Sequence, residues 1–212
     1  MAYVSTYPKT FDRFLRFKDI TFNSNAGAEE LRLYATFDIW IAAAYEAISR
    51  HCNQVIQSTA GTVISFRLDS LITDDTGNDY YLLPVLKVPI TISTVTGRSD
   101  IFDSVTTISA DNWDVITVNG LQRLYFVSGS APYTYGYVTA TVGYTDTNMP
   151  EEIHRVASEM VAEIYSESDL GKHRLGETNQ GENFQGVGTT TGFYELTERH
   201  KKALKPYTII AV

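Results

Sequence analysis

The sequence contains a single cysteine, Cys52, among its 212 residues. One thiol forms no intramolecular disulfide and cannot build a zinc site of several thiolates. Because Cys52 falls within an apolar helical pattern, we expect a buried small hydrophobe rather than a nucleophile. No apolar run approaches the roughly 18 residues that a membrane span requires, and residues 1–9 do not resemble a signal peptide. We therefore expect a protein made and kept in a reducing cytoplasm, with no membrane.

Basic charge is also scarce. Lys and Arg number 17 against 25 Asp and Glu, which gives a formal charge of −8. A protein that grips nucleic acid usually carries a basic stripe, and the densest basic clusters, Lys172–Arg174 and Arg199–Lys202, are short. An acidic chain can still surround DNA without holding it. The 14 tyrosines and the charged fraction of 20% suit either a surface covered by other protein or an ordinary β-rich domain.

Converging catalytic groups are not evident in the sequence. No two histidines stand four apart around a glutamate, and no G-x-S-x-G elbow is present, so we interpret all four as surface or helix-end residues: His51, His154, His173 and His200. The stretch 171–178 lacks the Gly-Lys-Ser/Thr ending of a phosphate loop. Asp74, Asp75, Asn78 and Asp79 could bind calcium, but their order favours a solvated turn. Asp111, Asn112, Trp113 and Asp114 could form a sugar-stacking site, but we interpret the tryptophan as the rim of a β core. The sequence predicts no catalytic residue, no cofactor and no metal.

Helical spacing dominates both ends of the chain. In the leader 1–25, Phe11, Phe14, Leu15 and Lys18 predict a short helix with Thr10 as its N-cap. Residues 26–57 predict a long helix whose stripe includes Phe37, Ile41 and Cys52, flanked by Trp40 and Tyr45. Residues 147–169 predict another helix, capped by Thr147 or Asn148, with Pro150, Glu151 and Glu152 in its first turn. A mobile Gly-rich loop (170–192), a short helix (193–205) and an apolar extended tail (206–212) are expected to follow.

The middle of the chain, residues 58–146, is rich in β-branched and aromatic residues. We expect six strands: Thr62–Leu68, Tyr80–Leu83, Pro89–Thr94, Val115–Val118, Leu121–Val127 and Gly136–Tyr144. Asn119–Gly120 is a two-residue hairpin signal. The predicted fold class is therefore α+β, a helical scaffold formed by residues 1–57 and 147–212 with an inserted antiparallel β-sandwich or barrel-like module at 58–146.

The order of several short motifs resembles the head–tail connector (adaptor) proteins of tailed bacteriophages that carry a β insertion. The most specific signal is the strand Tyr137-Val-Thr-Ala-Thr-Val-Gly-Tyr144, similar to "v-x-v-x-G-Y", followed by Pro150-Glu-Glu-Ile153 and Ala157, similar to "P-x-x-I-x-x-A". The other matching segments are Phe11–Phe17, Ala42–His51, Tyr80–Pro84 and Leu204–Tyr207. The leader is longer than the family's, and the tail after Tyr207 is a part whose length varies in the family.

The resemblance implies a structural virion protein in the neck, between capsid portal and tail. Family members form a homo-oligomeric ring, usually dodecameric, under the portal protein, and the ring extends the DNA channel toward a tail or stopper protein without sequence-specific DNA binding. The C-terminal segment typically grips the portal, so by position the docking residues are Leu204, Pro206, Tyr207, Ile209 and Ile210. The long helix offers a subunit interface at Phe37, Trp40, Ile41 and Tyr45.

Two other interpretations stay open. In the first, the chain is a carbohydrate-binding β module of a phage surface protein, in which Trp113, Tyr133 and Tyr135 stack on sugar rings. In the second it is a small hydrolase, which the missing catalytic cluster disfavours. A glycan array separates the sugar-binding interpretation from the connector.

Overall fold

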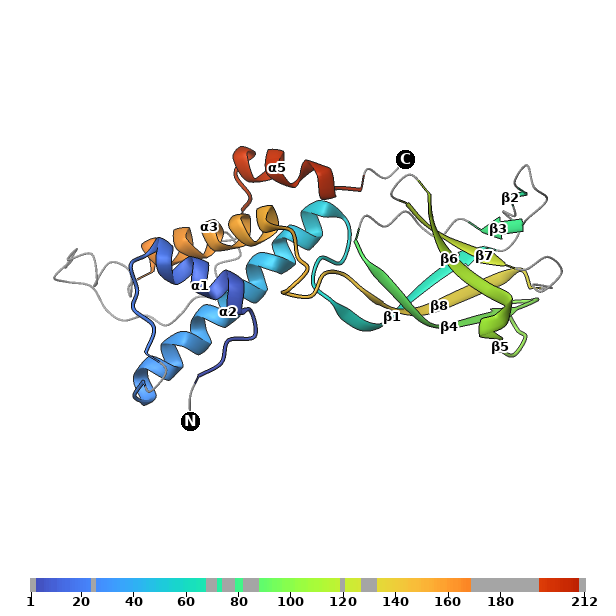
Figure 1. The fold of residues 1–212 in the computed structure, drawn as a ribbon, viewed down its shortest axis with the longest axis horizontal. Coiled ribbons are helices and arrows are strands. Elements are labelled where there is room, and N and C mark those ends of the chain that lie inside the picture. Colours follow the sequence, from blue (N-terminus) through green and yellow to red (C-terminus); the bar gives the residue numbers. More distant parts are fainter. Residues whose placement is uncertain are drawn as a thin grey trace. The chain divides into compact units, whose positions relative to one another are not determined.

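The structure is a computed structural model that describes residues 3–23, 26–67, 72–73, 79–81, 88–118, 121–126, 133–168 and 195–209. The chain divides into two compact units (Figure 1). The helical unit comprises Met1–Cys52 and Thr145–Pro206, and the β unit comprises Asn53–Tyr144 and Tyr207–Val212. Helices at both ends of the chain and antiparallel sheets between them confirm the α+β prediction.

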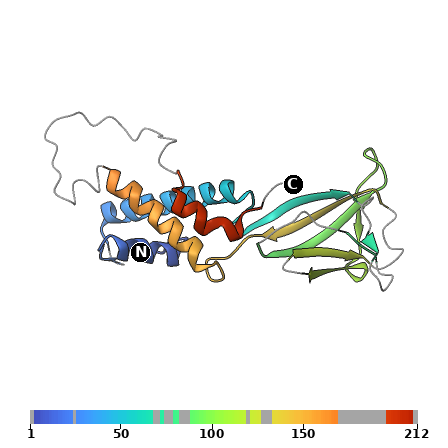
Figure 2. The same ribbon diagram turned by 90° about the horizontal axis from the view of Figure 1, so that it is seen from above.

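The helical unit is built on α1 (Pro8–Phe17), α2 (Ala28–Cys52), α3 (Glu151–Glu167) and α5 (Glu198–Leu204), followed by the 3-10 turn η2 (Lys205–Tyr207). In Figure 2, α5 lies beside α3. An aromatic cluster joins the first three helices, because the ring centroids of Phe14 and Phe37 are 4.8 Å apart and each lies 5.8 Å from that of Tyr165. Edge-on aromatic packing of this kind stabilises a core beyond simple area burial.

The ends of the helices differ from the predicted ones. Helix α1 begins at Pro8, which suits a first turn, so Thr10 lies inside the helix and the prediction that it caps the helix is wrong. The caps expected for α3 are also wrong, since the helix follows Pro150 without a side-chain cap. The hydroxyl of Thr197 caps α5, accepting a hydrogen bond from the backbone N–H of His200 at 3.3 Å.

The described residues of the β unit form two four-stranded antiparallel sheets. The first has the order β1 (Thr59–Arg67), β8 (Tyr135–Val142), β4 (Ile90–Arg98) and β5 (Thr106–Ile108). The second has the order β2 (Ile72–Thr73), β3 (Asp79–Tyr81), β7 (Leu121–Phe126) and β6 (Trp113–Val118). A 3-10 turn, η1 (Ala110–Asn112), precedes β6. Strands β2 and β5 were not predicted. Asn119 and Gly120 lie outside the described residues, although the strands that they join pair as predicted, with Val118 opposite Leu121.

Alternation along β8 divides the first sheet into two faces. Side chains at even positions from Gly136 to Val142 are buried, and those at odd positions are partly exposed. Residues from both sheets contribute to the buried core: Val95, Ile108, Leu124, Phe126, Val138, Ala140 and Val142. The face of β8 that carries Tyr135 and Tyr137 is therefore the outer face of its sheet.

Glycine is required where the chain leaves the β unit. Gly143 has a φ of +106°, and a Cβ built on it would lie 2.5 Å from the carbonyl oxygen of Gln57. Its N–H donates to the carbonyl of Pro89, and the next N–H, of Tyr144, donates to the carbonyl of Ile56 at 2.8 Å. The Gly-Tyr pair singled out in the sequence is thus a tight backbone junction, which a side chain would obstruct.

Two other predicted features are only partly described. Residues 170–192, predicted as a mobile loop, lie outside the described residues. The tail was predicted to be extended from Pro206 onward, but Pro206 and Tyr207 belong to the 3-10 turn η2. Proline favours such a turn because its φ is fixed near the helical value.

Candidate functional site

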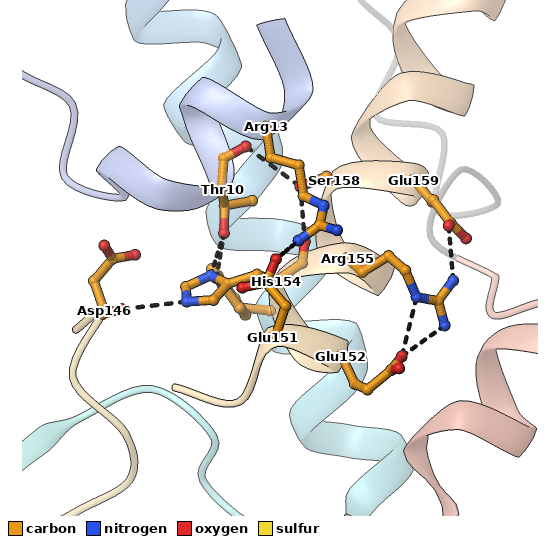
Figure 3. A network of polar contacts seen from close by, with 10 residues as sticks. Thr10, Arg13, Asp146, Glu151, Glu152, His154, Arg155, Ser158 and Glu159 are labelled. Atoms are coloured by element: carbon orange, nitrogen blue, oxygen red, sulfur yellow. Dashed lines mark hydrogen bonds and ion pairs between the residues drawn. The ribbon is translucent and has the colours of Figure 1, made fainter. Parts of the chain in front are cut away.

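A buried network in the helical unit brings titratable and hydroxyl side chains together (Figure 3). The Thr10 hydroxyl lies 2.6 Å from the Tyr45 hydroxyl and 2.7 Å from Nδ1 of His154, and the last two atoms are 3.0 Å apart. The Ser158 hydroxyl donates to the carbonyls of His154 and Thr10 at 2.7 and 3.3 Å. These side chains come from α1, α2 and α3, so the network joins all three helices.

The network fixes the tautomer of His154. Its Nε2 lies 3.2 Å from the carbonyl oxygen of Asp146, which can only accept, so Nε2 carries the proton and Nδ1 accepts from a hydroxyl. Burial lowers the pKa of His154 below its ordinary value, and burial raises the pKa of Tyr45 above its own. Both groups are therefore neutral at pH 7, and the contact is a chain of neutral hydrogen bonds.

This arrangement suits a structural connection better than catalysis. Ser158 and His154 are each 1% exposed, and Ser158 donates to main-chain carbonyls rather than to the imidazole. A serine nucleophile needs its base within hydrogen-bond reach of its hydroxyl and a path for substrate. Of the histidines predicted at the surface or at helix ends, His154 and His200 lie in the first turns of α3 and α5 but are buried, and His200 is 2% exposed.

A second polar group attaches α5 to α3. Glu159, on α3, accepts from Nη1 of Arg155 at 2.7 Å and lies 3.2 Å from Nε2 of His200 and 3.5 Å from Nη2 of Arg199. Burial alone would raise the pKa of Glu159, but the hydrogen bond and charge of Arg155, with Arg199 and His200, lower it overall. An ionised Glu159 thus lies between the two helices and stabilises their contact.

Of the four residues predicted for a subunit interface, three are buried and one is partly exposed. Phe37, Ile41 and Tyr45 have no exposed surface, because α1 and α3 already cover that face of α2. Side chains that are fully covered within their own chain cannot contact a neighbouring subunit, so the prediction that these three residues form a subunit interface is wrong. Trp40 is partly exposed, and its neighbour Ile39, not predicted, is 66% exposed.

The predicted docking residues of the C-terminal segment also differ in their exposure. Leu204 is fully buried in the helical unit, so it anchors α5 and is not free to contact another protein. Pro206 is exposed, and Tyr207 and Ile209 are partly exposed. The amide of Gln54 donates to the carbonyl oxygen of Tyr207, and both residues belong to the β unit. Ile210 lies outside the described residues.

The three rings proposed for sugar stacking do not converge. Trp113 lies in β6, in the second sheet. Tyr133 packs its ring against Gly97, where a Cβ would meet the ring atoms at 2.7–2.9 Å, on the inner side of the first sheet. Tyr135 lies on the outer side. No described surface therefore presents the three rings together.

The outer face of the first sheet carries a cluster of arginine and tyrosine side chains. Arg67, Tyr135 and Arg98 are in register across β1, β8 and β4. The Arg98 guanidinium lies over two rings, 5.8 Å from the centroid of Tyr135 and 5.2 Å from that of Tyr137. A depression of about 220 Å³ beside them is lined by Ser65, Arg67, Tyr135, Gly136 and Tyr137.

Other candidates from the sequence carry no site in the part of the chain that the structure describes. No group of three or more His, Cys, Asp or Glu residues there could hold a metal ion, and Cys52 is buried. Of the predicted polar turn, Asp74, Asp75 and Asn78 lie outside the described residues. None of the described helices is long and apolar enough to cross a membrane.

No protein-family model and no curated protein matches the chain. Among the solved structures that are similar to it, two match over nearly their whole length. A chain of the "Neck of empty GTA particle computed with C6 symmetry" covers 100% of this chain and 97% of its own, with a TM-score of 0.48 and 15% identity. A chain of the "Virion of native gene transfer agent (GTA) particle" covers 99% and 95%, with a TM-score of 0.45 and 16% identity. Such TM-scores and identities are too low to assign a family or a function.

Proposed function

We propose that this chain is a structural subunit of a tailed-phage virion, a head–tail connector that forms a ring under the portal and extends the DNA channel toward the tail. The observation that carries the proposal is the way the β unit joins the helical unit. Gly143-Tyr144 directly follows β8, which ends at Val142, and Pro150, the N-cap of α3, comes six residues after Tyr144. This is the pair of motifs on which the resemblance to connector proteins rests.

Each position of the motif has a physical role in this chain. Gly143 allows the close backbone contact with Gln57, as described above. Pro150 precedes the first turn of α3, and Ile153 and Ala157 are fully buried in the helical core. A motif whose residues each have a structural role within their own unit favours a shared architecture over a chance match of letters.

Exposed apolar side chains suit a subunit that packs against neighbours. Val4, Phe17 and Ile39 of the helical unit are 83%, 62% and 66% exposed. Copies around an axis need two different surfaces, because ring interfaces are head-to-tail. Trp40 and Ile39 are our candidates for one of them, with the buried Phe37 and Ile41 supporting α2 from behind.

The remaining parts of the proposal follow from the same resemblance. The ring is dodecameric and binds the portal protein through the exposed part of the C-terminal segment, at Pro206, Tyr207, Ile209 and Ile210. Its other side meets a tail or stopper protein, in the virion neck. A net charge of −8 suits a channel through which DNA slides without being held.

Portal binding tests the proposal directly. The full chain is mixed with the portal protein of its own particle, and the complex is examined by electron microscopy. We expect rings on the portal for the wild type and none after deletion of residues 206–212, with an unchanged circular dichroism spectrum. A truncated protein that still binds the portal would contradict the docking assignment, and a wild-type chain that forms no ring there would contradict the function.

A matched pair of substitutions tests the subunit surface. Ile39→Ser replaces a side chain that is 66% exposed on α2, and Val63→Ser replaces one that is 63% exposed in the β unit. Neither change should alter folding by more than about 0.5 kcal/mol, because both positions are exposed. We expect Ile39→Ser alone to reduce ring formation on the portal. Equal assembly by both variants would exclude Ile39 from the interface.

A further inference from the structure

The outer face of the sheet β1-β8-β4 has a charge that contrasts with its surroundings. Residues 53–144 contain four Lys or Arg and eight Asp, a formal charge of −4. Two of the four cations, Arg67 and Arg98, nevertheless lie on either side of Tyr135 in one cross-strand row. The outward positions of the next two rows carry only uncharged side chains: Ser65, Tyr137 and Thr96, then Val63, Thr139 and Thr94.

Arg98 is held in place before any partner arrives. Its guanidinium lies over Tyr135 and Tyr137, and its Nη1 donates to the carbonyl of Ile101 at 2.7 Å. Its Nε is buried without a hydrogen-bond partner among the described residues. An unpaired buried donor is costly, and the Nε edge of a guanidinium is one that binds a carboxylate in a bidentate manner.

An apolar loop adjoins this arginine. Residues Ile101, Phe102 and Val105, between β4 and β5, are 54%, 95% and 53% exposed. The loop has a defined turn, since the Asp100 carboxylate accepts from the N–H of Phe102 and the Asp103 carboxylate accepts from the N–H of Asp100. The hydrogen bond from Arg98 to Ile101 joins this apolar loop to the arginine and tyrosine face.

We propose that this surface, comprising the outer face around Arg98 and the loop 99–105, docks an acidic segment of another protein that carries apolar side chains beside its carboxylates. The Arg98 guanidinium suits one carboxylate, and Arg67, two strands away and roughly 10 Å from it at about 4.8 Å per strand, adds positive charge to the same face. The depression of about 220 Å³ accommodates a single side chain and is smaller than a typical small-molecule pocket. Tyrosine, phenylalanine and arginine are the residues that protein interfaces favour.

The same features disfavour nucleic acid as the partner. Single-stranded nucleic acid binds to sheets by stacking bases on exposed rings, but Arg98 already lies over both tyrosines. Two cations on this face neutralise few phosphates, so a nucleic-acid backbone gains little there. An exposed Phe102 is likewise better matched by an apolar side chain than by a phosphodiester.

Titration of the full chain by NMR tests the proposal. The probe is a short soluble peptide rich in Glu and Leu, the ligand control is the same peptide with every Glu replaced by Gln, and a thymidine oligonucleotide represents nucleic acid. We expect saturable shifts of the Arg98 Nε–H and of β8 amides with the Glu peptide only, weaker at high salt. Equal binding of the Gln peptide, or tighter binding of the oligonucleotide, would overturn the proposal.

Variants locate the binding. Arg98→Gln should weaken the Glu peptide about tenfold, whereas Arg16→Gln, which removes the same charge from an exposed position on α1, should change it less than about twofold. If Arg98→Gln loses structure, Thr96→Glu serves instead, since it adds a carboxylate beside Arg98 and should abolish binding. Unchanged affinity in a folded Arg98→Gln or Thr96→Glu variant would refute the site, as would self-association that depends on Arg98. The measurement involves no portal, so its outcome is separate from that of the proposed ring.

Discussion

Two substitutions in the buried network should have effects that do not add. Thr10→Val removes one hydroxyl with little change of volume and leaves the Tyr45 hydroxyl 3.0 Å from Nδ1 of His154. Tyr45→Phe removes the other and leaves Thr10 at 2.7 Å from the same nitrogen. Each single change loses one buried hydrogen bond, so each should lower the free energy of unfolding by about 1 kcal/mol.

The double variant differs in kind, because Nδ1 of His154 then has neither hydroxyl. His154 is 1% exposed, so water does not replace them. An acceptor buried without a partner costs about 1–3 kcal/mol, which is the coupling energy we expect from the double-mutant cycle.

Urea unfolding, followed by Trp40 fluorescence in a Trp113→Phe background, measures this coupling in the helical unit alone. Trp40 belongs to the helical unit and Trp113 to the β unit, so the background removes the second reporter. Additivity of the two single changes within about 0.5 kcal/mol would refute the reasoning, because it would mean that the two hydroxyls do not share His154.

Three further predictions concern other contacts. Gly143→Ala should destabilise the β unit by about 1–3 kcal/mol in thermal unfolding, since φ is +106° and the new Cβ would overlap backbone; unchanged stability would contradict the close contact. Because burial holds the pKa of His154 below 6.5, the unfolded chain binds its proton first as pH falls. Stability should therefore decline below about pH 6.5, by at most about 1.4 kcal/mol per pH unit, and level off below the folded pKa, a component that His154→Gln should lack. Glu159→Gln should speed amide exchange in α5 by about tenfold, whereas Glu163→Gln, exposed on the same helix, should not; equal effects would exclude the α3–α5 contact.

Periodicity predicted the long elements well. The spacing of apolar residues through Phe37, Ile41 and Cys52 predicted α2, and β-branched alternation predicted β8. Strands β2 and β5 are two and three residues long, too short to show any alternation, so the sequence could not reveal them. The predicted N-caps were wrong because a threonine or asparagine near the start of a helix is not always the residue that precedes its first turn.

The buried network escaped prediction for a physical reason. A polar residue in an amphipathic helix normally indicates the solvent side, yet Thr10 lies four residues before the buried Phe14. His154 and Ser158 likewise stand four apart, next to the buried Ile153 and Ala157. Polar residues at the spacing of the apolar stripe were the signal available, and it indicates a polar contact inside the core.

The surfaces were harder to predict than the elements. A stripe such as Phe37, Ile41 and Tyr45 shows which side chains are covered but does not show what covers them, and here it is the chain's own α1 and α3. The Arg98 cluster depends on pairing with Tyr135, 37 positions further along the chain. Such a pairing follows from the sheet register, which local sequence does not specify.

The path of the chain into and out of the β unit bears on how such a protein can change over time. Ile56 and Ser58, just before β1, are hydrogen-bonded to Tyr144, just after β8, at 2.8 and 2.9 Å, and Gln57 forms an isolated parallel bridge with Tyr144. A module whose two ends are fastened side by side can be lengthened, shortened or replaced at its far loops without pulling its ends apart. Relatives could therefore differ greatly in this module, in size and in sequence, while keeping the same helical frame.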